Sequence, residues 1–507
     1  AAMRDDLQLD PRVLDRARIS RDARFDGKFF IAVTSTGIYC PPICPSRTSK
    51  PANVRYYATA AAAAEAGFRP CLRCRPEAAP GTAAWLGTSA VVNRALRMIN
   101  EGALDDASVE TLAARLGVSS RHLHRLFMRH VGAGPITVAQ TRRLHFAKRL
   151  LDETRLPITQ IALASGFGSV RRFNDAFRAT YRRTPQELRA ERRVGAPVIA
   201  ADKVVLKLAY RPPYDWPHMA QFLATVAIDG VERVTDDSYT RTITTSAGHA
   251  LVSVQPIAHE HALALRISGA EPSALVHIAS TARRMFDLAA DSGAIDAALG
   301  ADVLLGQCVR RRPGLRIPGA WDPFECAVQC VLSESASPET TRCLMHELVM
   351  LAGGRTQSKT MDLSCTFPTP AAIASAELDA LAMPAWKRQA LQRLARTLVD
   401  SHCSLSDSEA VMQALMSISE VSDPTLQAMA LRSLSEPDAF PIDDRVRCGA
   451  AALGGAPLSD GELARLAESW RPWRGYAAMH LWAASMGTTI KGTPASIYLP
   501  RFIIADA

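Results

Sequence analysis

The sequence lacks long hydrophobic runs, a regular pattern of cysteines and a leader-like start. No run approaches the roughly 18 uninterrupted apolar residues that a membrane span needs, and the first residues, AAMRDD, lack the basic and then apolar pattern of a secretory signal. Seven of the 11 cysteines are scattered irregularly between residues 308 and 448, which does not match a disulfide framework. We therefore expect a cytoplasmic protein with no membrane partner.

The chain has the length and composition of a multidomain globular protein with one basic segment. Its 507 residues allow about three domains of roughly 150 residues each, and 48% of them are hydrophobic. The net charge is +9, yet residues 85–195 hold 19 Lys and Arg against 9 Asp and Glu. A basic segment beside nearly neutral ones favours a nucleic-acid partner over a merely solvated basic surface.

Changes of pattern divide the chain into three blocks. We place the first at residues 1–80, where it ends in the loop-forming PEAAPGT, and the second at 85–195, which is rich in Arg and helical periodicity. The third, 203–490, opens with four segments typical of strands (VVLKLAY, TRTITTS, ALVSVQP and ALALRIS) and then turns mostly helical. The pattern predicts a multidomain fold in which the second block is all-α and the third is α+β.

The first block contains two close pairs of cysteines. Three residues separate Cys40 from Cys44, and 26 residues later Cys71 and Cys74 follow with two residues between them. Such pairs let a chain clamp one tetrahedral Zn²⁺ with four thiolates. Most four-cysteine zinc sites are structural, but a centre with a charge of about −2 keeps a reachable sulfur nucleophilic at neutral pH. From spacing alone, both a structural and a reactive site stay open.

Residues around these cysteines carry a family resemblance. FDGKFFIAVTSTGIYCPPICPSR and ANVRYYATAAAAAEAGFRPCLRCRP resemble the zinc domain of Ada-type alkylation-response proteins. The resemblance implies a small α+β domain in which Cys40 irreversibly accepts a methyl group from a methylphosphotriester of DNA. It implies that Cys44, Cys71 and Cys74 only hold the Zn²⁺. It also implies three residues beside the phosphate: Thr36, Arg47 and Arg69.

Two helix-turn-helix patterns fill the second block. SVETLAARLGVSSRHLHRLFMRH predicts a short helix, a turn at Gly117 and a second helix, and LPITQIALASGFGSVRRFNDAFRATYRRTPQELR repeats the plan with Gly166 in the turn. Together they resemble the paired DNA-reading module of AraC-type regulators. The resemblance implies double-stranded promoter DNA as a partner, with RNA polymerase as a further candidate. The residues expected to read DNA are Arg121, His122, Arg125, Arg171, Arg172 and Asn174.

The third block resembles AlkA-type 3-methyladenine DNA glycosylases. The resemblance rests on KLAYRPPYDWPHMAQFLATVAIDGVERV, FPTPAAIASAELDAL, DAFPIDDRVR and ESWRPWRGYAAMHLW. It implies an α+β helix-hairpin-helix fold and a monofunctional glycosylase that flips an alkylated base out of the duplex and cleaves its glycosidic bond. Asp444 would stabilise the positive charge that grows on the sugar. Phe222 and Trp482 would line the base pocket.

The same block departs from that family at its DNA grip. The aligned hairpin, SISEVSDPT, has lost both turn glycines and carries carboxylates where a phosphate would bind. Stacking partners worth about 1–3 kcal/mol per base are missing, and the wedge that fills the vacated stack is small and polar. The departing residues are Ser335, Glu420, Ser422, Asp423, Pro424, Ala428 and Arg445.

Other residues that could carry chemistry have structural interpretations. The sequence contains no PCHR motif, so we do not expect the O⁶-methylguanine transferase activity that some Ada proteins carry. We interpret HEH at 259–261 as strand alternation rather than a metal site. The scattered cysteines are expected to be buried in cores: Cys308, Cys326, Cys330, Cys343, Cys365, Cys403 and Cys448.

We therefore predict a DNA alkylation-response protein with Zn²⁺ as its cofactor. It combines irreversible methyl acceptance, transcription activation enhanced by that methylation, and excision of alkylated bases. One alternative is a methyl acceptor and regulator whose glycosylase-like domain is catalytically silent. A second is a transcription regulator alone, with a structural zinc and a silent C-terminal domain.

Overall fold

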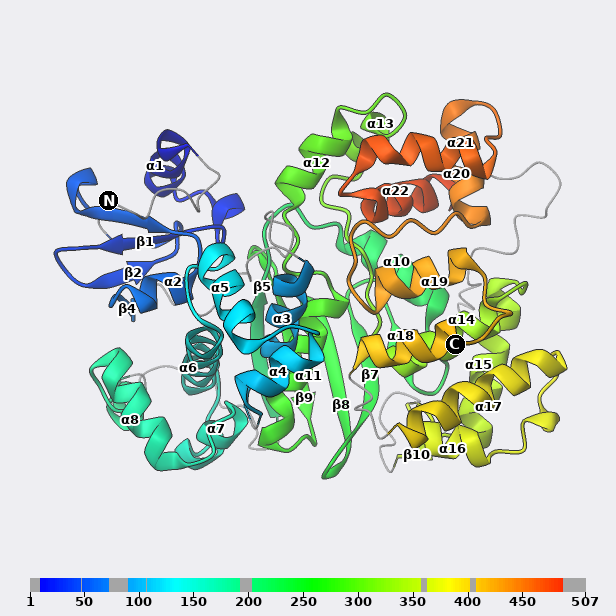
Figure 1. Ribbon diagram of the computed structural model, residues 1–507, viewed down its shortest axis with the longest axis horizontal. Helices are drawn as coiled ribbons and strands as arrows, with labels where there is room; N and C mark the ends of the chain where they lie inside the picture. Colours follow the sequence, from blue (N-terminus) through cyan, green and yellow to red (C-terminus); the bar gives the residue numbers. More distant parts are fainter. Residues whose placement is uncertain are drawn as a thin grey trace, which may run out of the picture.

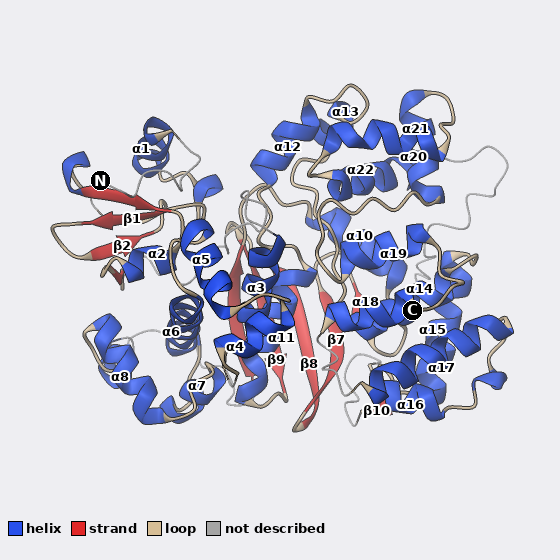
Figure 2. Cartoon of the chain, viewed as in Figure 1, coloured by secondary structure: helices blue, strands red, loops and turns tan. Residues whose placement is uncertain are grey.

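The computed structural model describes residues 10–46, 48–72, 90–105, 107–191, 203–356, 363–401 and 407–486. Its helices and strands form three consecutive parts that pack against one another (Figure 1). Among the described residues, strands occur in the first part, at the beginning of the third part and, as one short pair, further along the third part (Figure 2). The predicted multidomain fold class, with an all-α second part between two mixed ones, is confirmed.

The first part is a small sheet between two helices. The strand order is β3-β1-β2-β4, with β4 parallel to β2 and the other pairs antiparallel. Neighbouring residues of a strand point to opposite faces, so Phe30 packs toward α2 and Ile31 toward α1. The bounds are α1 (Pro11–Ser20), β1 (Phe30–Val33), β2 (Ile38–Cys40), β3 (Val54–Tyr57), α2 (Ala60–Glu65) and β4 (Arg69–Pro70).

The second part forms two helix-turn-helix units joined by a long helix. Gly117 and Gly166 lie in the two turns at φ of +69° and +79°, a conformation that strains residues with a Cβ. Ser119 and Ser169 then cap the second helix of each unit. Both predicted units are confirmed. The bounds are α3 (Ala90–Asn100), α4 (Val109–Arg115), α5 (Ser120–His130), α6 (Pro135–Glu153), α7 (Ile158–Ala164), α8 (Val170–Tyr181) and α9 (Pro185–Glu191).

The third part opens with an antiparallel sheet of order β5-β9-β8-β7-β6, which packs on α10 (Trp216–Val226) and α11 (Leu275–Met285). The four predicted strands are confirmed, but the edge strand β6 was missed because its three residues show no apolar alternation. The expectation that HEH belongs to a strand was wrong. It lies in the turn between β8 and β9, where His259 has a φ of +62°. The bounds are β5 (Lys203–Ala209), β6 (Glu232–Val234), β7 (Tyr239–Thr245), β8 (Gly248–Pro256) and β9 (Ala262–Ser268).

The helices that follow enclose two further hydrophobic cores. One core forms among α14 to α19, and the other unites α12, α13 and α20 to α22 with Phe222 of α10. The bounds are α12 (Ser292–Gly300), α13 (Gly306–Arg311), α14 (Pro323–Ser333), α15 (Pro338–Ala352), β10 (Gly354–Arg355), β11 (Cys365–Thr366), α16 (Pro370–Ser375), α17 (Ala385–Asp400), α18 (Ser408–Met416), α19 (Asp423–Arg432), α20 (Asp444–Gly454), α21 (Asp460–Ala467) and α22 (Arg474–Met486).

The scattered cysteines do not all enter these cores. Cys326, Cys330 and Cys365 are buried as expected. The expectation was wrong for Cys343 and Cys448, which are exposed because they lie on the outward faces of α15 and α20. Cys308 is partly buried, and Cys403 lies outside the described residues. Within the described chain, no helix is both long enough and apolar enough to cross a membrane.

Polar contacts fix the three parts to one another. Lys28 of the first part pairs with Asp291 of the third at 2.5 Å. Arg149 of α6 donates a hydrogen bond of 2.9 Å to the carbonyl oxygen of Lys207 in β5. One hydrophobic core also runs without interruption from the second helix-turn-helix unit into the sheet of the third part. The three parts are therefore in direct contact with one another and are not separated by linkers alone.

Candidate functional site

Three cysteine thiols converge at one end of the first sheet. Cys40 ends β2 and Cys71 follows β4, and because these strands run parallel and in register, both residues leave the sheet at the same end. Cys44 returns through a turn in which its N–H donates to the carbonyl of Pro41 at 3.2 Å. The Sγ atoms of the three cysteines all lie within 4.8 Å of one another.

This arrangement fits one metal ion. Sulfurs at about 2.3 Å from a tetrahedral Zn²⁺ stand roughly 3.8 Å apart, which agrees with the observed cluster. Cys71 is buried, whereas Cys40 and Cys44 are half-buried, so solvent and a ligand can reach the latter two. The predicted fourth ligand, Cys74, and the predicted phosphate contact Arg47 lie outside the described residues.

The two other predicted phosphate contacts lie near the start of β2. Thr36 is exposed in the turn before the strand, and Arg69 of β4 pairs in register with Ile38. Paired residues on neighbouring strands share a face, as do residues two apart on one strand, so Arg69 lies on the same face as Cys40, about 7 Å further along. An arginine side chain spans that distance.

Tyr39, which precedes Cys40 in β2, joins this strand to the second part. Tyr39 is 1% exposed, and its hydroxyl shares a hydrogen bond of 2.7 Å with Nε2 of His145 on α6. Burial lowers the pKa of His145 to about 4, so the imidazole is neutral at pH 7. The candidate methyl acceptor is therefore one residue away from a direct contact with the helix that joins the two helix-turn-helix units.

Both predicted recognition helices present polar side chains to solvent. On α5, Arg121 and Arg125 are exposed, and Nη2 of Arg125 lies 2.8 Å from Nδ1 of His122. The helix α6 lies between the two units. Its 19 residues span about 28 Å, a length close to the roughly 34 Å of one turn of DNA. The predicted contacts on α8 are exposed as well: Arg171, Arg172 and Asn174.

Part of the basic charge of the second part is neutralised inside the molecule. Arg94 of α3 pairs with Glu409, and Arg115 of α4 pairs with Asp407 at 2.7 Å. These ion pairs hold α3 and α4 beside the start of α18. Total charge therefore overstates the basic surface that is left for DNA.

The predicted base pocket holds two stacked rings with a guanidinium over each. Phe222 and Trp482 lie nearly parallel, with centroids 5.7 Å apart and 16° between the planes. Cζ of Arg432 is 5.4 Å from the Phe222 centroid, and Cζ of Arg445 is 5.8 Å from that of Trp482. The sequence showed Arg445 only as a replaced aromatic, and Arg432 was missed because no local spacing signals its contact.

Two adjacent aspartates at the start of α20 have different environments. Oδ1 of Asp443 accepts hydrogen bonds of 2.9 Å from the Val446 N–H and from Nε1 of Trp482. Burial raises the pKa of Asp443. Asp444, the predicted catalytic residue, has a side chain that is 95% exposed and pairs with Arg447 at 2.7 Å. Asp443 thus orients Trp482, while Asp444 is exposed to solvent.

A carboxylate from the end of α14 lies against the start of α19, beside the turn between α18 and α19. Oε2 of Glu334 accepts hydrogen bonds from the Ser422 N–H at 3.2 Å, from the Ser422 hydroxyl at 3.0 Å and from the Thr425 hydroxyl at 2.6 Å. The predicted wedge position beside it, Ser335, has a φ of +51°. A helix N-terminus attracts anions, and here a carboxylate of the chain already occupies it.

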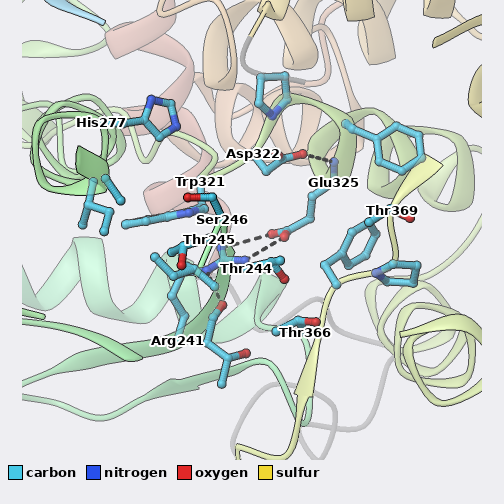
Figure 3. Close-up of a pocket in the computed structure, with 18 of the residues that line it drawn as sticks. Arg241, Thr244, Thr245, Ser246, His277, Trp321, Asp322, Glu325, Thr366 and Thr369 are labelled. Carbon is cyan, nitrogen blue, oxygen red and sulfur yellow. Dashed lines mark hydrogen bonds and ion pairs between the residues drawn. The ribbon is translucent and has the colours of Figure 1, made fainter. Parts of the chain in front are cut away.

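A separate cavity of about 470 Å³ lies beside β7, α11 and the start of α14 (Figure 3). Arg241 in its lining pairs with Glu325 at 2.8 Å and with Glu232 at 3.1 Å. None of the described site residues named above lines it. These ion pairs join the sheet to α14, so we infer that Arg241, Glu232 and Glu325 stabilise the third part.

Family models match each part of the chain. The metal binding domain of Ada matches residues 14–77, a helix-turn-helix domain matches 112–191, and the AlkA N-terminal domain matches 205–322. The observed elements agree with these assignments, because the thiol cluster lies in the first match and both recognition helices lie in the second.

Curated relatives cover single parts or nearly the whole chain. A probable bifunctional transcriptional activator/DNA repair enzyme AlkA of Mycobacterium tuberculosis is 38% identical over 472 residues, 92% of this chain and 95% of that protein. DNA-3-methyladenine glycosylase 2 of Escherichia coli is 33% identical over 54% of this chain and 95% of its own length. The bifunctional transcriptional activator/DNA repair enzyme Ada of Escherichia coli is 36% identical over 29% of this chain and 40% of its own. With its thiol cluster, paired helix-turn-helix units and AlkA-like third part, the chain belongs to the family of bifunctional transcriptional activator/DNA repair enzymes of the Ada and AlkA type.

Proposed function

We propose that this protein answers DNA alkylation with two reactions, methyl acceptance by Cys40 and excision of damaged bases, and that the first reaction activates transcription. The observation that carries the first reaction is the cluster of three thiols at the end of the sheet, with Arg69 on the same face as Cys40. The Ada match over residues 14–77 and the names of the relatives support it.

In the proposed transfer, the Cys40 sulfur attacks the methyl carbon of a methylphosphotriester. The bond between that carbon and oxygen breaks, its electron pair returns to the phosphate oxygen, and Cys40 becomes a thioether. A bound Zn²⁺ would keep the thiols deprotonated at neutral pH. The phosphate would be held by hydrogen bonds and charge from Thr36, Arg47 and Arg69. The ligands would be Cys40, Cys44, Cys71 and Cys74.

Methylation of Cys40 removes one negative charge from a surface that meets DNA. Repulsion from phosphates then falls, and the exposed residues of α5 and α8 hold promoter DNA more tightly. The Tyr39–His145 contact connects β2, the protein strand that ends in Cys40, directly to α6. RNA polymerase is the further partner that activation requires.

The test compares binding of a duplex from upstream of the protein's own coding sequence before and after incubation with methylphosphotriester DNA. The treated protein gains affinity, and the gain shrinks as salt rises. Cys40→Ala gains nothing, whereas Cys343→Ala, which alters an exposed cysteine of α15, behaves as wild type. An equal gain in Cys40→Ala would refute methyl acceptance at this residue.

For the third part, the proposed reaction is hydrolysis of the glycosidic bond of an alkylated base. The exposed Asp444 would stabilise the positive charge of the sugar in the transition state, and Asp443 would hold Trp482 for stacking. The similarity to DNA-3-methyladenine glycosylase 2 over 54% of this chain supports the proposal.

A second candidate is a third part that keeps the glycosylase fold without cutting. Glu334 favours it, because its carboxylate occupies the helix N-terminus where the hairpin of the family meets a phosphate. Release of 3-methyladenine from methylated duplex DNA separates the two. We expect release that Asp444→Asn abolishes and that Asp460→Asn, which breaks the other ion pair of Arg447, leaves intact. A wild-type protein that is folded and zinc-loaded but releases no base would establish the silent alternative.

A further inference from the structure

The surfaces on which a flipped base would stack are covered by side chains of the chain itself. Phe222 is 4% exposed and Trp482 is 5% exposed, and each carries a guanidinium at about cation–π distance. A base can stack on Trp482 only if a covering group moves or makes room. The base then lies within a few ångströms of whatever charge that group carries.

The two guanidinium groups are anchored differently. Nη1 of Arg432 donates a hydrogen bond of 2.7 Å to Oε1 of Gln329, so its position beside Phe222 is fixed. Among the described residues, no hydrogen bond or ion pair holds the side chain of Arg445, which is half-buried and lies over Trp482. Arg445 is therefore the group that yields space to a base, and its charge stays at the pocket because its backbone belongs to the first turn of α20.

The neighbouring carboxylates offset this charge only in part, since Asp443 alone among the described ones interacts with Arg445 electrostatically. Asp444 pairs with Arg447 at 2.7 Å and points to solvent. Asp443 is committed to the N-terminus of α20 and to the indole of Trp482. The described pocket thus places two arginines, Arg432 and Arg445, against one half-buried carboxylate.

We propose that Arg445 makes this site select damaged bases that are neutral over the cationic bases that methylation of purines at N3 or N7 produces. The proposal rests on the glycosylase function proposed above and specifies its substrate class. A cationic base beside Arg445 meets a like charge, and at a separation of about 4 Å in a partly screened site this repulsion corresponds to roughly a tenfold or larger loss of binding.

Bond cleavage adds to the preference. In both cases the oxygen of water bonds to C1′ and the glycosidic electron pair leaves with the base. A cationic base departs neutral, and the proton of the water is released to solvent. A neutral base develops negative charge as it departs and takes up that proton, so a nearby guanidinium stabilises its transition state. Arg445 therefore favours neutral bases both in binding and in cleavage.

The experiment uses the full-length protein and two duplexes that differ only in one base, hypoxanthine as the neutral probe and 7-methylguanine as the cationic one. Single-turnover base release is measured for wild type, Arg445→Gln and Arg445→Lys. We expect wild type to release hypoxanthine faster, Arg445→Lys to keep that order, and Arg445→Gln to shift the ratio of the two rates at least tenfold toward 7-methylguanine. Release of both bases with an unchanged ratio in Arg445→Gln would overturn the proposal.

Binding separates this proposal from the glycosylase function. If no variant releases either base, the glycosylase function fails. The affinities of the protein for the same, uncleaved duplexes then decide the selectivity. The hypoxanthine duplex should then bind about tenfold more tightly than the 7-methylguanine duplex, and Arg445→Gln should remove the difference. Equal affinities of wild type for both duplexes would refute the selectivity itself.

Discussion

The hydroxyl of Tyr39 lies 2.7 Å from Nε2 of His145 and joins the strand that ends in Cys40 to the helix between the two DNA-reading units. Tyr39 is buried and His145 is half-buried, so loss of one leaves the other without this partner. A change at the thiol cluster is thereby connected to α6 through one residue. This contact underlies the first prediction.

Tyr39→Phe should separate methyl acceptance from activation. We expect transfer to Cys40 to persist, the gain in promoter affinity to shrink, and the free energy of unfolding to fall by about 1–3 kcal/mol. Quantitative transfer, DNA titration and urea unfolding measure the three effects. Tyr57→Phe is a matched control, because the Tyr57 hydroxyl is buried in the same sheet and has no hydrogen-bond partner among the described residues. A full affinity gain in Tyr39→Phe would show that the contact carries no signal.

Glu334→Gln should strengthen contact between the third part and DNA. The substitution keeps the shape but removes negative charge from the N-terminus of α19, so affinity for undamaged duplex should rise about two- to fivefold at low salt. Glu339→Gln, which neutralises an exposed carboxylate on the neighbouring helix α15, controls for net charge and should have a smaller effect. If both variants gain the same affinity for DNA, the position of Glu334 at the N-terminus of α19 has no special role.

Local sequence patterns predicted the elements that carry chemistry, because those elements depend on neighbours in the chain. Gly117 and Gly166 predict turns next to the helices that they join, and alternating segments predict β5 and β7 to β9. The spacing of the cysteines likewise predicted that thiols would meet, and three described ones do.

Contacts between distant segments could not be predicted in this way. Glu334 and Ser422 are 88 residues apart, and no pattern in either segment signals that one accepts hydrogen bonds from the other. The stack of Arg445 on Trp482 and the pairing of Arg115 with Asp407 are of the same kind. Such contacts arise from the packing of whole parts, so charge counts and motif spacing do not contain them.

Arg241→Met should destabilise the third part strongly. Arg241 is 2% exposed and pairs with Glu232 and Glu325, so its removal leaves two buried carboxylates without their cation. We expect a loss of about 3–5 kcal/mol in the free energy of unfolding. Arg233→Met, at an exposed position of the neighbouring strand β6, should cost less than about 0.5 kcal/mol. Similar losses in both variants would contradict this role of the ion pairs.

His480→Leu should reduce the acid sensitivity of the third part. Burial lowers the pKa of His480 to about 3, so below pH 6.5 the unfolded chain takes up a proton that the folded chain refuses. The stability that this residue contributes is complete above pH 6.5 and is lost as the pH falls toward 3, by about 1.4 kcal/mol per pH unit. Unfolding midpoints between pH 7 and 4 should therefore fall less steeply in the variant. His249→Leu, at an exposed position, should keep the wild-type slope, and an unchanged slope in His480→Leu would disprove the assignment.

The most direct test of the account is to find where a methyl group from DNA ends up. The full-length protein is incubated with duplex DNA that carries methylphosphotriesters, digested, and examined by mass spectrometry for peptides that gain one CH₂. The account predicts that the gain falls on Cys40 alone, reaches one methyl group per chain and stops. No gain, or a gain on Cys44 or on the exposed Cys343, would contradict it.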